Sequence, residues 1–312
     1  MSKIAYVFPG QGSQAVGMGR DLDEASPRWV DANAALGFDL RRLCFDGPEA
    51  DLTLTANTQP AILTASIVVL DALLAAGRRF DFVAGHSLGE YSALVAAGAL
   101  DFADAVRTVR ARGQFMQEAV APGEGAMAAI IGLDRSLVLQ ACDEAGAAGV
   151  VQVANLNAPG QTVIAGAVAA VKRAVELARA KGAKRALPLP VSAPFHSVLM
   201  EPAAARLQEV LRTLRIGDLR APLVTNVDAD LLTDGGRVAD ALVRQVTAPV
   251  RWEEVVARLV KEGVGTFVEV GPGRVLSGLI RRIAPEARVL NVEDRASLAA
   301  TLAALDGDEP RE

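Results

Sequence analysis

Residues 80–98, FDFVAGHSLGEYSALVAAG, contain a short apolar run, a serine flanked by glycines, and a second apolar segment that ends in glycine. The run at residues 80–85 predicts a buried strand, and residues 88–97 predict a helix that Gly98 ends. Between them, the pentapeptide GHSLG at residues 85–89 fits the pattern G-x-S-x-G. At a strand-to-helix junction this pattern is typical of a nucleophile elbow, so the stretch predicts an α/β fold with a reactive serine.

The pentapeptide has a clear chemical use. A sharp turn projects the hydroxyl of Ser87 into a cleft, and the flanking glycines allow the backbone and a substrate to come close. The helix that starts near Leu88 directs free backbone N–H groups toward the same point, where they would stabilise an oxyanion. The alternative is a glycine-rich turn in which Ser87 only caps the helix.

Two histidines, His86 and His196, are the only imidazoles in the chain, so a histidine base for Ser87 must be one of them. His86 adjoins Ser87, and neighbouring side chains on such a turn diverge, so His86 is expected to pack or hydrogen-bond beside the site. His196 lies in the proline-containing segment SAPFHS at residues 192–197, a loop typical of catalytic residues. The alternative for His196 is a loop histidine with local hydrogen bonds only.

The amino-acid composition excludes several classes of function. The chain has 312 residues, of which 51% are hydrophobic and 4% aromatic, enough to bury a core in two domains at about 150 residues each. A net charge of −5 argues against a sequence-independent nucleic-acid binder. Cys44 and Cys142 lack the spacing of a redox or zinc site, and two histidines provide no zinc site either, so both thiols are expected in the core of a protein from a reducing compartment.

No targeting or membrane-spanning segment is expected. The apolar run within residues 1–14 is too short for a signal peptide. Residues 61–76 are the most apolar stretch, but Thr64, Ser66 and Asp71 interrupt it, so it predicts a buried helix rather than a membrane span. We therefore expect a cytoplasmic protein that does not bind membranes.

The pattern of elements changes near residue 124. Strand, helix, strand, strand, helix and strand are predicted in that order, at residues 126–131, 135–145, 150–155, 162–165, 168–181 and 185–189. This order is the ferredoxin-like pattern, and alternating helices and strands resume after it. The sequence therefore predicts a large α/β domain at residues 1–123 and 191–312, interrupted by a small ferredoxin-like domain at residues 124–190.

Several spaced motifs together resemble a known family. GHSLGEY at residues 85–91, FPGQGSQ at 8–14 and APFHS at 193–197 resemble the malonyl-CoA:acyl-carrier-protein transacylases of type II fatty acid synthesis, to which polyketide synthase acyltransferase domains are similar. NLNAPGQ at residues 155–161 and VEVGPG at 268–273 extend the resemblance over nearly the whole chain. It implies a hydrolase-like parallel-sheet domain, a small ferredoxin-like domain, and an active site in the cleft between them.

The resemblance implies catalytic roles by position. Ser87 would be the nucleophile that carries the acyl group as an ester, and His196 would be its base. This family has no carboxylate as third member of a triad; a main-chain carbonyl orients the imidazole, and Gln245 occupies that position here. The backbone N–H groups of Gln11 and Leu88 would form the oxyanion hole.

Specificity is also implied by position. A guanidinium grips a carboxylate bidentately, so Arg112 would hold the free carboxylate of a malonyl group. Without the family, Arg112 would be read as one of several arginines on a solvated helix face. Phe195 would narrow the pocket against an α-methyl branch and so favour malonyl, and His86 would lie beside the pocket.

The implied reaction is a ping-pong transfer from malonyl-CoA through Ser87 to the phosphopantetheine thiol of an acyl carrier protein, by a monomer without metal or other cofactor. The carrier is expected to be acidic, so an acidic enzyme needs a local basic patch. The predicted docking patch on the small domain consists of Lys172, Arg173, Lys181, Lys184 and Arg185. The alternative reading of these residues is a solvated helix face.

Three other functions stay open at this point. The first is that the chain serves a polyketide synthase as a trans-acting acyltransferase. A serine thioesterase would share Ser87 and His196 but would have no need of Arg112. A catalytically silent carrier-docking subunit is the third reading, and the presence of both Ser87 and His196 argues against it.

Overall fold

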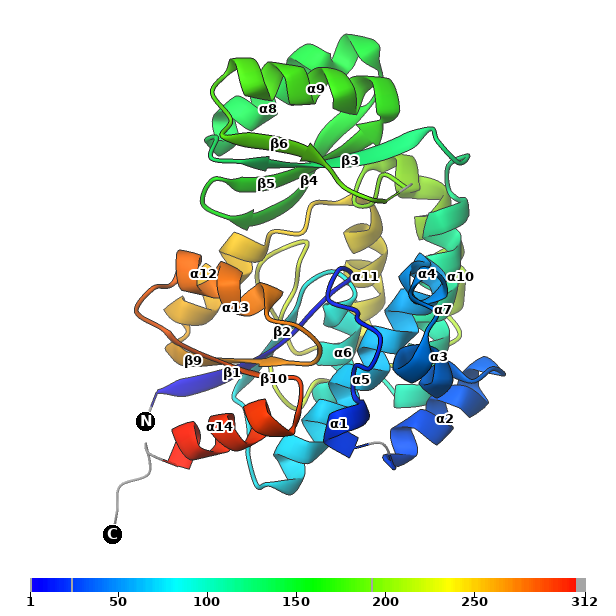
Figure 1. Cartoon of the computed structure of the whole chain (residues 1–312), viewed down its shortest axis with the longest axis vertical. Helices are drawn as coiled ribbons and strands as arrows, with labels where there is room; N and C mark the ends of the chain where they lie inside the picture. The colour runs from blue at the N-terminus through cyan, green and yellow to red at the C-terminus, as the bar shows by residue number, and fades with distance from the viewer. Residues whose placement is uncertain (1, 24, 192, 307–312) are drawn as a thin grey trace.

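Two sheets of different kind make up the computed structural model, which describes residues 2–23, 25–191 and 193–306 (Figure 1). The large sheet consists of β1 (Lys3–Phe8), β2 (Phe82–Gly85), β7 (Leu223–Val224), β8 (Leu231–Leu232), β9 (Val264–Val270) and β10 (Arg288–Val292). Their order is β10-β9-β1-β2-β7-β8, and all neighbours are parallel except β7 and β8. The predicted α/β class with a parallel sheet is confirmed.

Parallel pairing places the site at one edge of the large sheet. Phe8, at the end of β1, pairs with Gly85, at the end of β2. The carboxyl ends of parallel strands share an edge, where ligands bind in open α/β sheets. The loop that follows β1 and the elbow that follows β2 therefore lie side by side.

Helices cover both faces of the large sheet. The first face is covered mainly by α5 (Thr55–Ala75), α6 (Gly89–Ala96), α7 (Phe102–Glu118), α10 (Glu201–Leu211) and α11 (Val238–Thr247). The second is covered by α12 (Trp252–Lys261) and α13 (Val275–Ile283). Alternation along β1 matches this arrangement: Tyr6 and Phe8 face the first set, and Ala5 and Val7 face the second.

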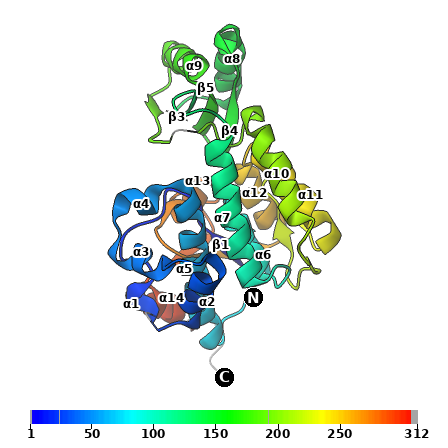
Figure 2. The same cartoon turned by 90° about the vertical axis from the view of Figure 1, so that its right-hand side faces the viewer.

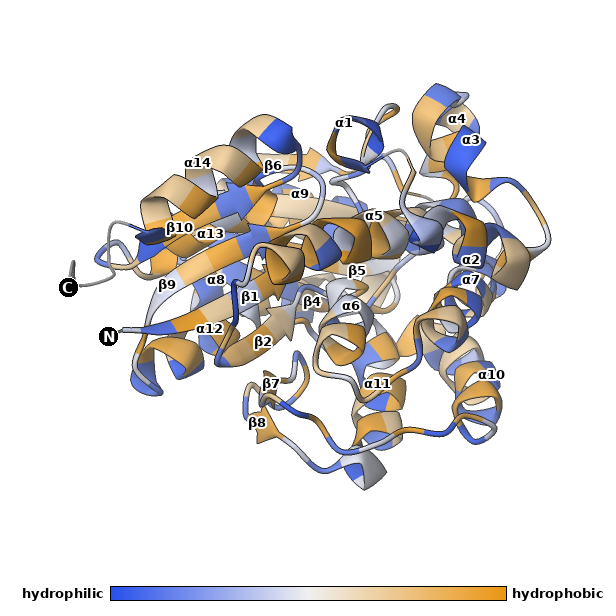
Figure 3. Ribbon diagram, turned by 90° about the horizontal axis from the view of Figure 1, so that it is seen from below, coloured by the Kyte–Doolittle hydropathy of each residue, from blue (hydrophilic) through white to orange (hydrophobic). Residues whose placement is uncertain are grey.

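Short helices and the C-terminal helix complete this part of the fold. They are α1 (Arg20–Asp23), α2 (Pro27–Leu36), α3 (Leu40–Asp46), α4 (Glu49–Thr53) and α14 (Arg295–Asp306), with single 3₁₀ turns at Val198–Met200 and Gly235–Arg237; a third turn, Gly146–Ala148, belongs to the small-sheet part. Helix α5 is long and apolar enough to span a membrane by composition, but 78% of its most apolar window is buried inside the protein. Figure 3 shows that most of this helix is coloured as hydrophobic.

The small sheet is antiparallel and carries its own helices. It consists of β3 (Gly125–Ile131), β4 (Val151–Ala158), β5 (Gln161–Ala167) and β6 (Arg185–Pro188) in the order β4-β5-β3-β6, with α8 (Arg135–Ala145) and α9 (Val168–Ala180). The strand–helix–strand–strand–helix–strand order is the predicted one. Both helices pack on the face turned away from the large sheet (Figure 2). The opposite face presents Met127 and Val163 toward the rest of the chain.

Main-chain hydrogen bonds connect the two parts. Val250 follows α11 and forms a parallel bridge with Asn155 of β4. The N–H of Leu156 donates to the Val250 carbonyl at 2.9 Å, and the N–H of Val250 donates to the Ala154 carbonyl at 2.9 Å. The edge of the small sheet is therefore held in register against the segment that follows α11.

The structure corrects several predicted bounds. The helix expected at residues 61–76 begins at Thr55 and contains Pro60, whose ring favours a helix start but here lies inside the helix. The strand expected at residues 80–85 begins only at Phe82. Strands β7 and β8 were not predicted, because strands of two residues carry no periodic pattern.

Candidate active site

Packing at the elbow requires both glycines of the pentapeptide. Ser87 has a φ of +52°, in the left-handed region that a residue with a side chain rarely adopts. A Cβ on Gly85 would lie 1.9 Å from the carbonyl carbon of Gly89, and one on Gly89 would lie 2.0 Å from the carbonyl oxygen of Phe8. Only glycine fits these two positions, so strand, elbow and helix pack closely and the serine stays in its strained turn.

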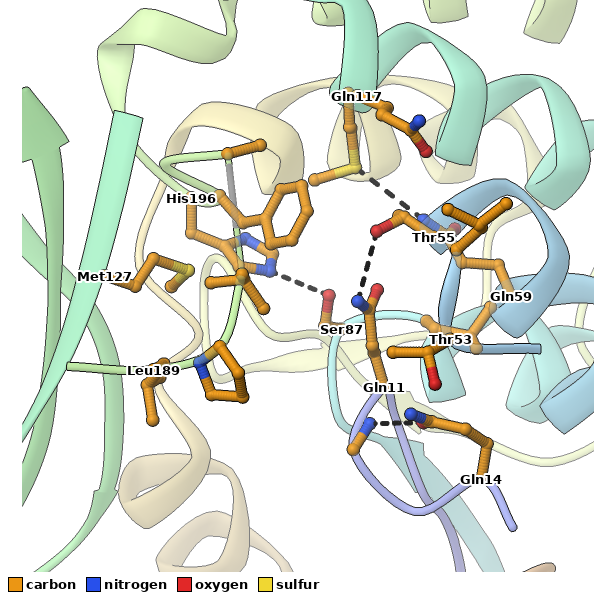
Figure 4. Close-up of a pocket in the computed structure, with 18 of the residues that line it drawn as sticks. Gln11, Gln14, Thr53, Thr55, Gln59, Ser87, Gln117, Met127, Leu189 and His196 are labelled. Atoms are coloured by element: carbon orange, nitrogen blue, oxygen red, sulfur yellow. Dashed lines mark hydrogen bonds between the residues drawn. The ribbon is translucent and has the colours of Figure 1, made fainter. Parts of the chain in front are cut away.

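Ser87, His196 and Gln245 form a hydrogen-bonded chain. His196 Nε2 lies 2.7 Å from Ser87 Oγ (Figure 4), and His196 Nδ1 lies 2.8 Å from the main-chain oxygen of Gln245. A carbonyl only accepts, so Nδ1 carries the hydrogen and Nε2 is free to accept the proton of Ser87. The geometry of a nucleophile with an oriented base is therefore present.

Electrostatics keep His196 neutral. Burial, and then the positive charge of Arg112, lower the pKa of His196 to about 3, against a partial rise from the Gln245 carbonyl. A neutral imidazole is the form that accepts a proton. At neutral pH His196 is therefore in the form that can take the proton of Ser87 when the serine attacks a substrate.

Arg112 is buried beside the serine. It is 2% exposed, and its Nη2 donates to Ser87 Oγ at 3.1 Å and to Gln245 Oε1 at 3.0 Å. Its Nη1 donates to Gln59 Oε1 at 2.8 Å, and its guanidinium lies 5.6 Å from the ring centre of Tyr91. The reading of Arg112 as part of a solvated helix face is wrong, because this residue is on the side of α7 that faces the site.

Gln11 and Leu88 lie on the two loops that parallel pairing brings together. Both line the same pocket as Ser87. A Cβ on Gly10 would lie 2.4 Å from the His86 carbonyl oxygen, so glycine allows the loop after β1 to approach the elbow. The side chain of Gln11 donates to Thr55 Oγ1 at 3.1 Å, which fixes this loop against α5 (Figure 4).

His86 faces the small sheet rather than the serine hydroxyl. Its Nε2 lies 2.9 Å from Asn157 Oδ1, and its ring centre lies 5.7 Å from that of Trp252. Burial lowers the pKa of His86. This histidine therefore connects the elbow to β4.

The pocket has a volume of about 510 Å³ and opens between the two sheets. Ser87, Gln59 and Arg112 lie on the large-sheet wall, a name we keep for these three residues. Met127, Leu189 and Val191 form the small-sheet wall. Figure 4 shows Met127 and Leu189 on the side opposite Gln59. Phe195 lies between the walls and packs against both core regions.

Three buried polar residues of the site were not found from the sequence. Asn226 Oδ1 accepts from the Ser87 N–H at 2.6 Å, and Asn226 Nδ2 donates to the Gly85 carbonyl at 2.6 Å. Glu90 accepts from the Asn226 N–H at 2.9 Å, and burial raises the pKa of Glu90 to about 7. Gln59 is the third. Polar residues inside apolar segments are the signal that would have drawn attention to Gln59 and Glu90.

The residues of the predicted docking patch lie on and after α9, away from the pocket lining. Lys172 and Arg173 are on α9, Lys181 and Lys184 follow it, and Arg185 begins β6. Two of them have acidic partners: Arg173 pairs with Glu176 at 3.0 Å, and Lys181 with Glu144 at 2.7 Å. These ion pairs reduce the local excess of positive charge.

Cys44 and Cys142 are free and buried, and burial raises the pKa of the Cys142 thiol to about 12. Burial also raises the pKa of the Cys44 thiol. Within residues 2–23, 25–191 and 193–306, no group of three or more histidine, cysteine or acidic side chains is placed to hold a metal. Neither thiol lies in the pocket lining.

A serine and an oriented imidazole on a parallel α/β sheet are the arrangement of enzymes that form serine-bound acyl groups. The model of the acyl transferase domain matches residues 5–300, and the chain belongs to this family. It is 52% identical over 299 residues to the malonyl CoA-acyl carrier protein transacylase of Bacillus subtilis (strain 168), covering 94% of each chain. The Escherichia coli (strain K12) relative of the same name is 49% identical over 307 residues, 97% of this chain and 99% of the relative.

Solved structures agree with these relatives. An acyl carrier protein S-malonyltransferase from Vibrio cholerae has 48% identity and a TM-score of 0.94, covering 96% of this chain and 100% of that one. A malonyl-transacylase in complex with a type II PKS acyl-carrier protein has 47% identity and a TM-score of 0.95, covering 97% and 100%. The resemblance seen in the motifs is confirmed over nearly the whole chain.

Proposed function

We propose that this chain is an acyltransferase that moves a malonyl group from malonyl-CoA to the phosphopantetheine thiol of an acyl carrier protein. The observation that carries the proposal is the buried guanidinium of Arg112, 3.1 Å from Ser87 Oγ. A cation beside the nucleophile suits an acyl group that ends in a carboxylate. The names of relatives at 49% and 52% identity support the same substrates.

In the first half-reaction, Arg112 binds the malonyl carboxylate, and Ser87 Oγ attacks the thioester carbonyl carbon. His196 Nε2 takes the serine proton, and the backbone N–H groups of Gln11 and Leu88 stabilise the oxyanion. The carbon–sulfur bond then breaks, and His196 returns the proton to the CoA sulfur. The product is a malonyl ester on Ser87 with free CoA.

In the second half-reaction, the thiol of the carrier's phosphopantetheine arm attacks the Ser87 ester. His196 accepts the thiol proton and returns it to Ser87 Oγ as the ester bond breaks. Each step balances with one proton shuttled by one imidazole. We propose no metal or redox cofactor for this chain, because no step of the transfer requires one.

Arg112 also affects the base. Its charge lowers the proton affinity of His196 in the empty site. A bound malonyl carboxylate offsets that charge, so the imidazole becomes a stronger base once the correct substrate is in place. An acyl group without a carboxylate brings no such offset. The arginine therefore favours malonyl both in binding and in catalysis.

We further propose a cytoplasmic monomer with two domains, residues 124–190 forming the small one and residues 1–123 and 191–312 the large one. A separate sheet and a separate core cluster support the small domain. The carrier would dock on the basic patch of Lys172, Arg173, Lys181, Lys184 and Arg185. Within the part of the chain that the structure describes, Lys184 forms no ion pair, whereas Lys181 is paired with Glu144, so Lys184 is the more informative position.

Charge reversal tests the docking patch. Lys184→Glu is expected to raise the KM for the carrier a few-fold and to leave the KM for malonyl-CoA unchanged, because surface charges act on association. Lys261→Glu, on α12, is the control of equal charge change. An equal carrier KM for both variants would contradict the patch.

A loading assay tests the function itself. The protein is incubated with malonyl-CoA, with and without holo-acyl carrier protein, and the masses of the carrier and the enzyme are measured. We expect a malonyl adduct on Ser87 without the carrier, and malonyl-carrier with it. Rapid hydrolysis without loading would instead show a thioesterase. Because one solved relative is bound to a polyketide carrier, the assay includes carriers of both pathways.

A further inference from the structure

A buried carboxylate contacts one of the residues that orient the site, through a hydrogen bond from the Gln245 side chain. Glu90 is on α6, one turn after Ser87, and is 1% exposed. We propose that Glu90 is a positioning residue that acts through the side chain of Gln245 to hold Arg112 in its carboxylate-binding orientation, and so sets the preference for malonyl. This inference rests on the function proposed above and adds a residue to it.

The first step is the orientation of the Gln245 amide. Its Nε2 donates to Glu90 Oε2 at 3.0 Å and to the Ser87 carbonyl at 3.0 Å. The Ser87 carbonyl only accepts, and Glu90 Oε2 also accepts from the Asn226 N–H at 2.9 Å, so the nitrogen end of the amide faces these two oxygens. The oxygen end is then turned toward Arg112, whose Nη2 donates to it at 3.0 Å. Glu90 and the Ser87 carbonyl thereby favour the amide orientation in which Arg112 meets an acceptor and not a second donor.

The second step joins this amide to the base. The main-chain oxygen of the same Gln245 accepts from His196 Nδ1 at 2.8 Å. One fully buried residue thus orients the imidazole through its backbone and the guanidinium through its side chain. The two functions are separable, because a substitution at Gln245 changes the side chain and keeps the carbonyl.

The third step is charge. Arg112 is buried, and burial lowers its pKa, while Tyr91 and then the charge of Glu90 act in the opposite direction. A buried guanidinium without a compensating charge is strongly destabilising. The ionised form of Glu90, whose pKa burial raises to about 7, supplies part of that compensation without a direct contact, since the hydrogen bonds of the Arg112 guanidinium go to Gln59, Ser87 and Gln245. Arg112 also lines the pocket, where it can bind the malonyl carboxylate.

A second buried carboxylate provides a structural comparison. Glu269, on β9, is 0% exposed, and its two oxygens accept from the N–H groups of Leu276 and Ser277 at 3.0 and 2.7 Å. This carboxylate caps α13 and is saturated by the backbone. Glu90 Oε1, in contrast, makes no hydrogen bond with the described part of the chain. Glu269 serves the fold, and Glu90 serves the site.

The experiment compares the malonyl-to-acetyl ratio of kcat/KM for acylation of Ser87. The rate of acylation is measured from the release of CoA. Glu90→Gln and Gln245→Met are the test variants, and Glu269→Gln is the matched control. We expect a drop of about tenfold in the ratio for Gln245→Met, since a hydrogen bond to a charged group is lost, and a smaller drop for Glu90→Gln. The KM for malonyl-CoA should rise more than kcat falls. Glu269→Gln should lower the melting temperature without changing the ratio.

The double variant Glu90→Gln, Gln245→Met tests whether Glu90 acts through the side chain of Gln245. If Glu90 acts through Gln245, Glu90→Gln adds nothing to the ratio in the Gln245→Met background. Full additivity, or an unchanged ratio in folded Glu90→Gln, would overturn the proposal. Should Glu90→Gln fail to fold, Glu90→Asp replaces it, since the shorter side chain keeps the charge but withdraws from Gln245. Failure of the unmodified protein to transfer malonyl would refute the proposed function instead, and would be seen before any variant is compared.

Discussion

The two walls of the pocket are built from different kinds of interaction. On the large-sheet wall, Ser87 and Arg112 belong to a hydrogen-bonded set with distances of 2.6 to 3.1 Å. The small-sheet wall presents the apolar side chains of Met127, Leu189 and Val191. One wall fixes the reacting groups, and the other shapes the space around the acyl chain. Substitutions on the first should therefore change rates or the preference for an acyl group that carries a charge, and substitutions toward the second should change the size and shape of the acyl groups that fit.

The largest expected effect is the loss of the base. His196→Ala should lower kcat/KM for acylation by about 10³-fold, because general base catalysis contributes on this scale. The measurement is the initial rate of CoA release, with circular dichroism to confirm folding. A loss of less than tenfold in a folded variant would contradict the role of His196.

The second largest effect is expected from removing the positive charge of Arg112 on the large-sheet wall. Arg112→Ala should lower malonyl transfer by about 10²-fold and keep or increase acetyl transfer, since a buried charge pair to the substrate is removed. Arg107→Ala is the control on the same helix, because Arg107 is exposed and pairs with Asp104. Equal losses for malonyl and acetyl groups would show that Arg112 is structural.

A smaller effect is expected where the two walls meet. Phe195→Ser should raise the methylmalonyl-to-malonyl ratio of kcat/KM by about tenfold, the usual scale for one methyl group in a pocket. The assay is competition between the two CoA thioesters, with the products separated by mass. An unchanged ratio would remove Phe195 from the determinants of specificity.

The last prediction concerns pH: the imidazole of His196 should not titrate near neutral pH. Burial and the nearby Arg112 lower the pKa of His196 to about 3, and burial lowers the pKa of His86. The chain has two histidines, so the imidazole C–H signals in NMR spectra are few, and those of His196 should not shift between about pH 5 and 8. The unfolded chain takes up these protons near pH 6.5, so stability should fall as the pH drops below that value. A titration of His196 near pH 6.5 would contradict the electrostatics of the site.

Local sequence signals predicted the parts of the site that are local in structure. The elbow is one example, because steric exclusion at Gly85 and Gly89 requires glycine at fixed spacing around Ser87. The order of elements in the small sheet is another, since each strand and helix carries its own pattern. Family resemblance, and not spacing, directed attention to Arg112, whose burial nothing in its own helix predicts.

The remaining polar set is invisible in a single sequence for a physical reason. Gln245 lies 155 residues from Glu90 and 133 from Arg112 along the chain, so their contact exists only after folding. Asn226 follows β7, a strand of two residues whose position depends on its neighbours. Such contacts are products of packing, and no periodicity precedes them.

The main-chain bridge between Val250 and β4 has a consequence for how the specificity of this enzyme can diverge. Peptide hydrogen bonds are indifferent to side-chain identity, so residues on the small sheet can be exchanged while the sheet stays anchored. Val250 follows closely on Gln245, and the anchor is therefore tied to the segment that orients the base. Laboratory evolution of new acyl preferences can thus begin at Met127 and its neighbours, with the distance from that wall to the serine held constant by the backbone.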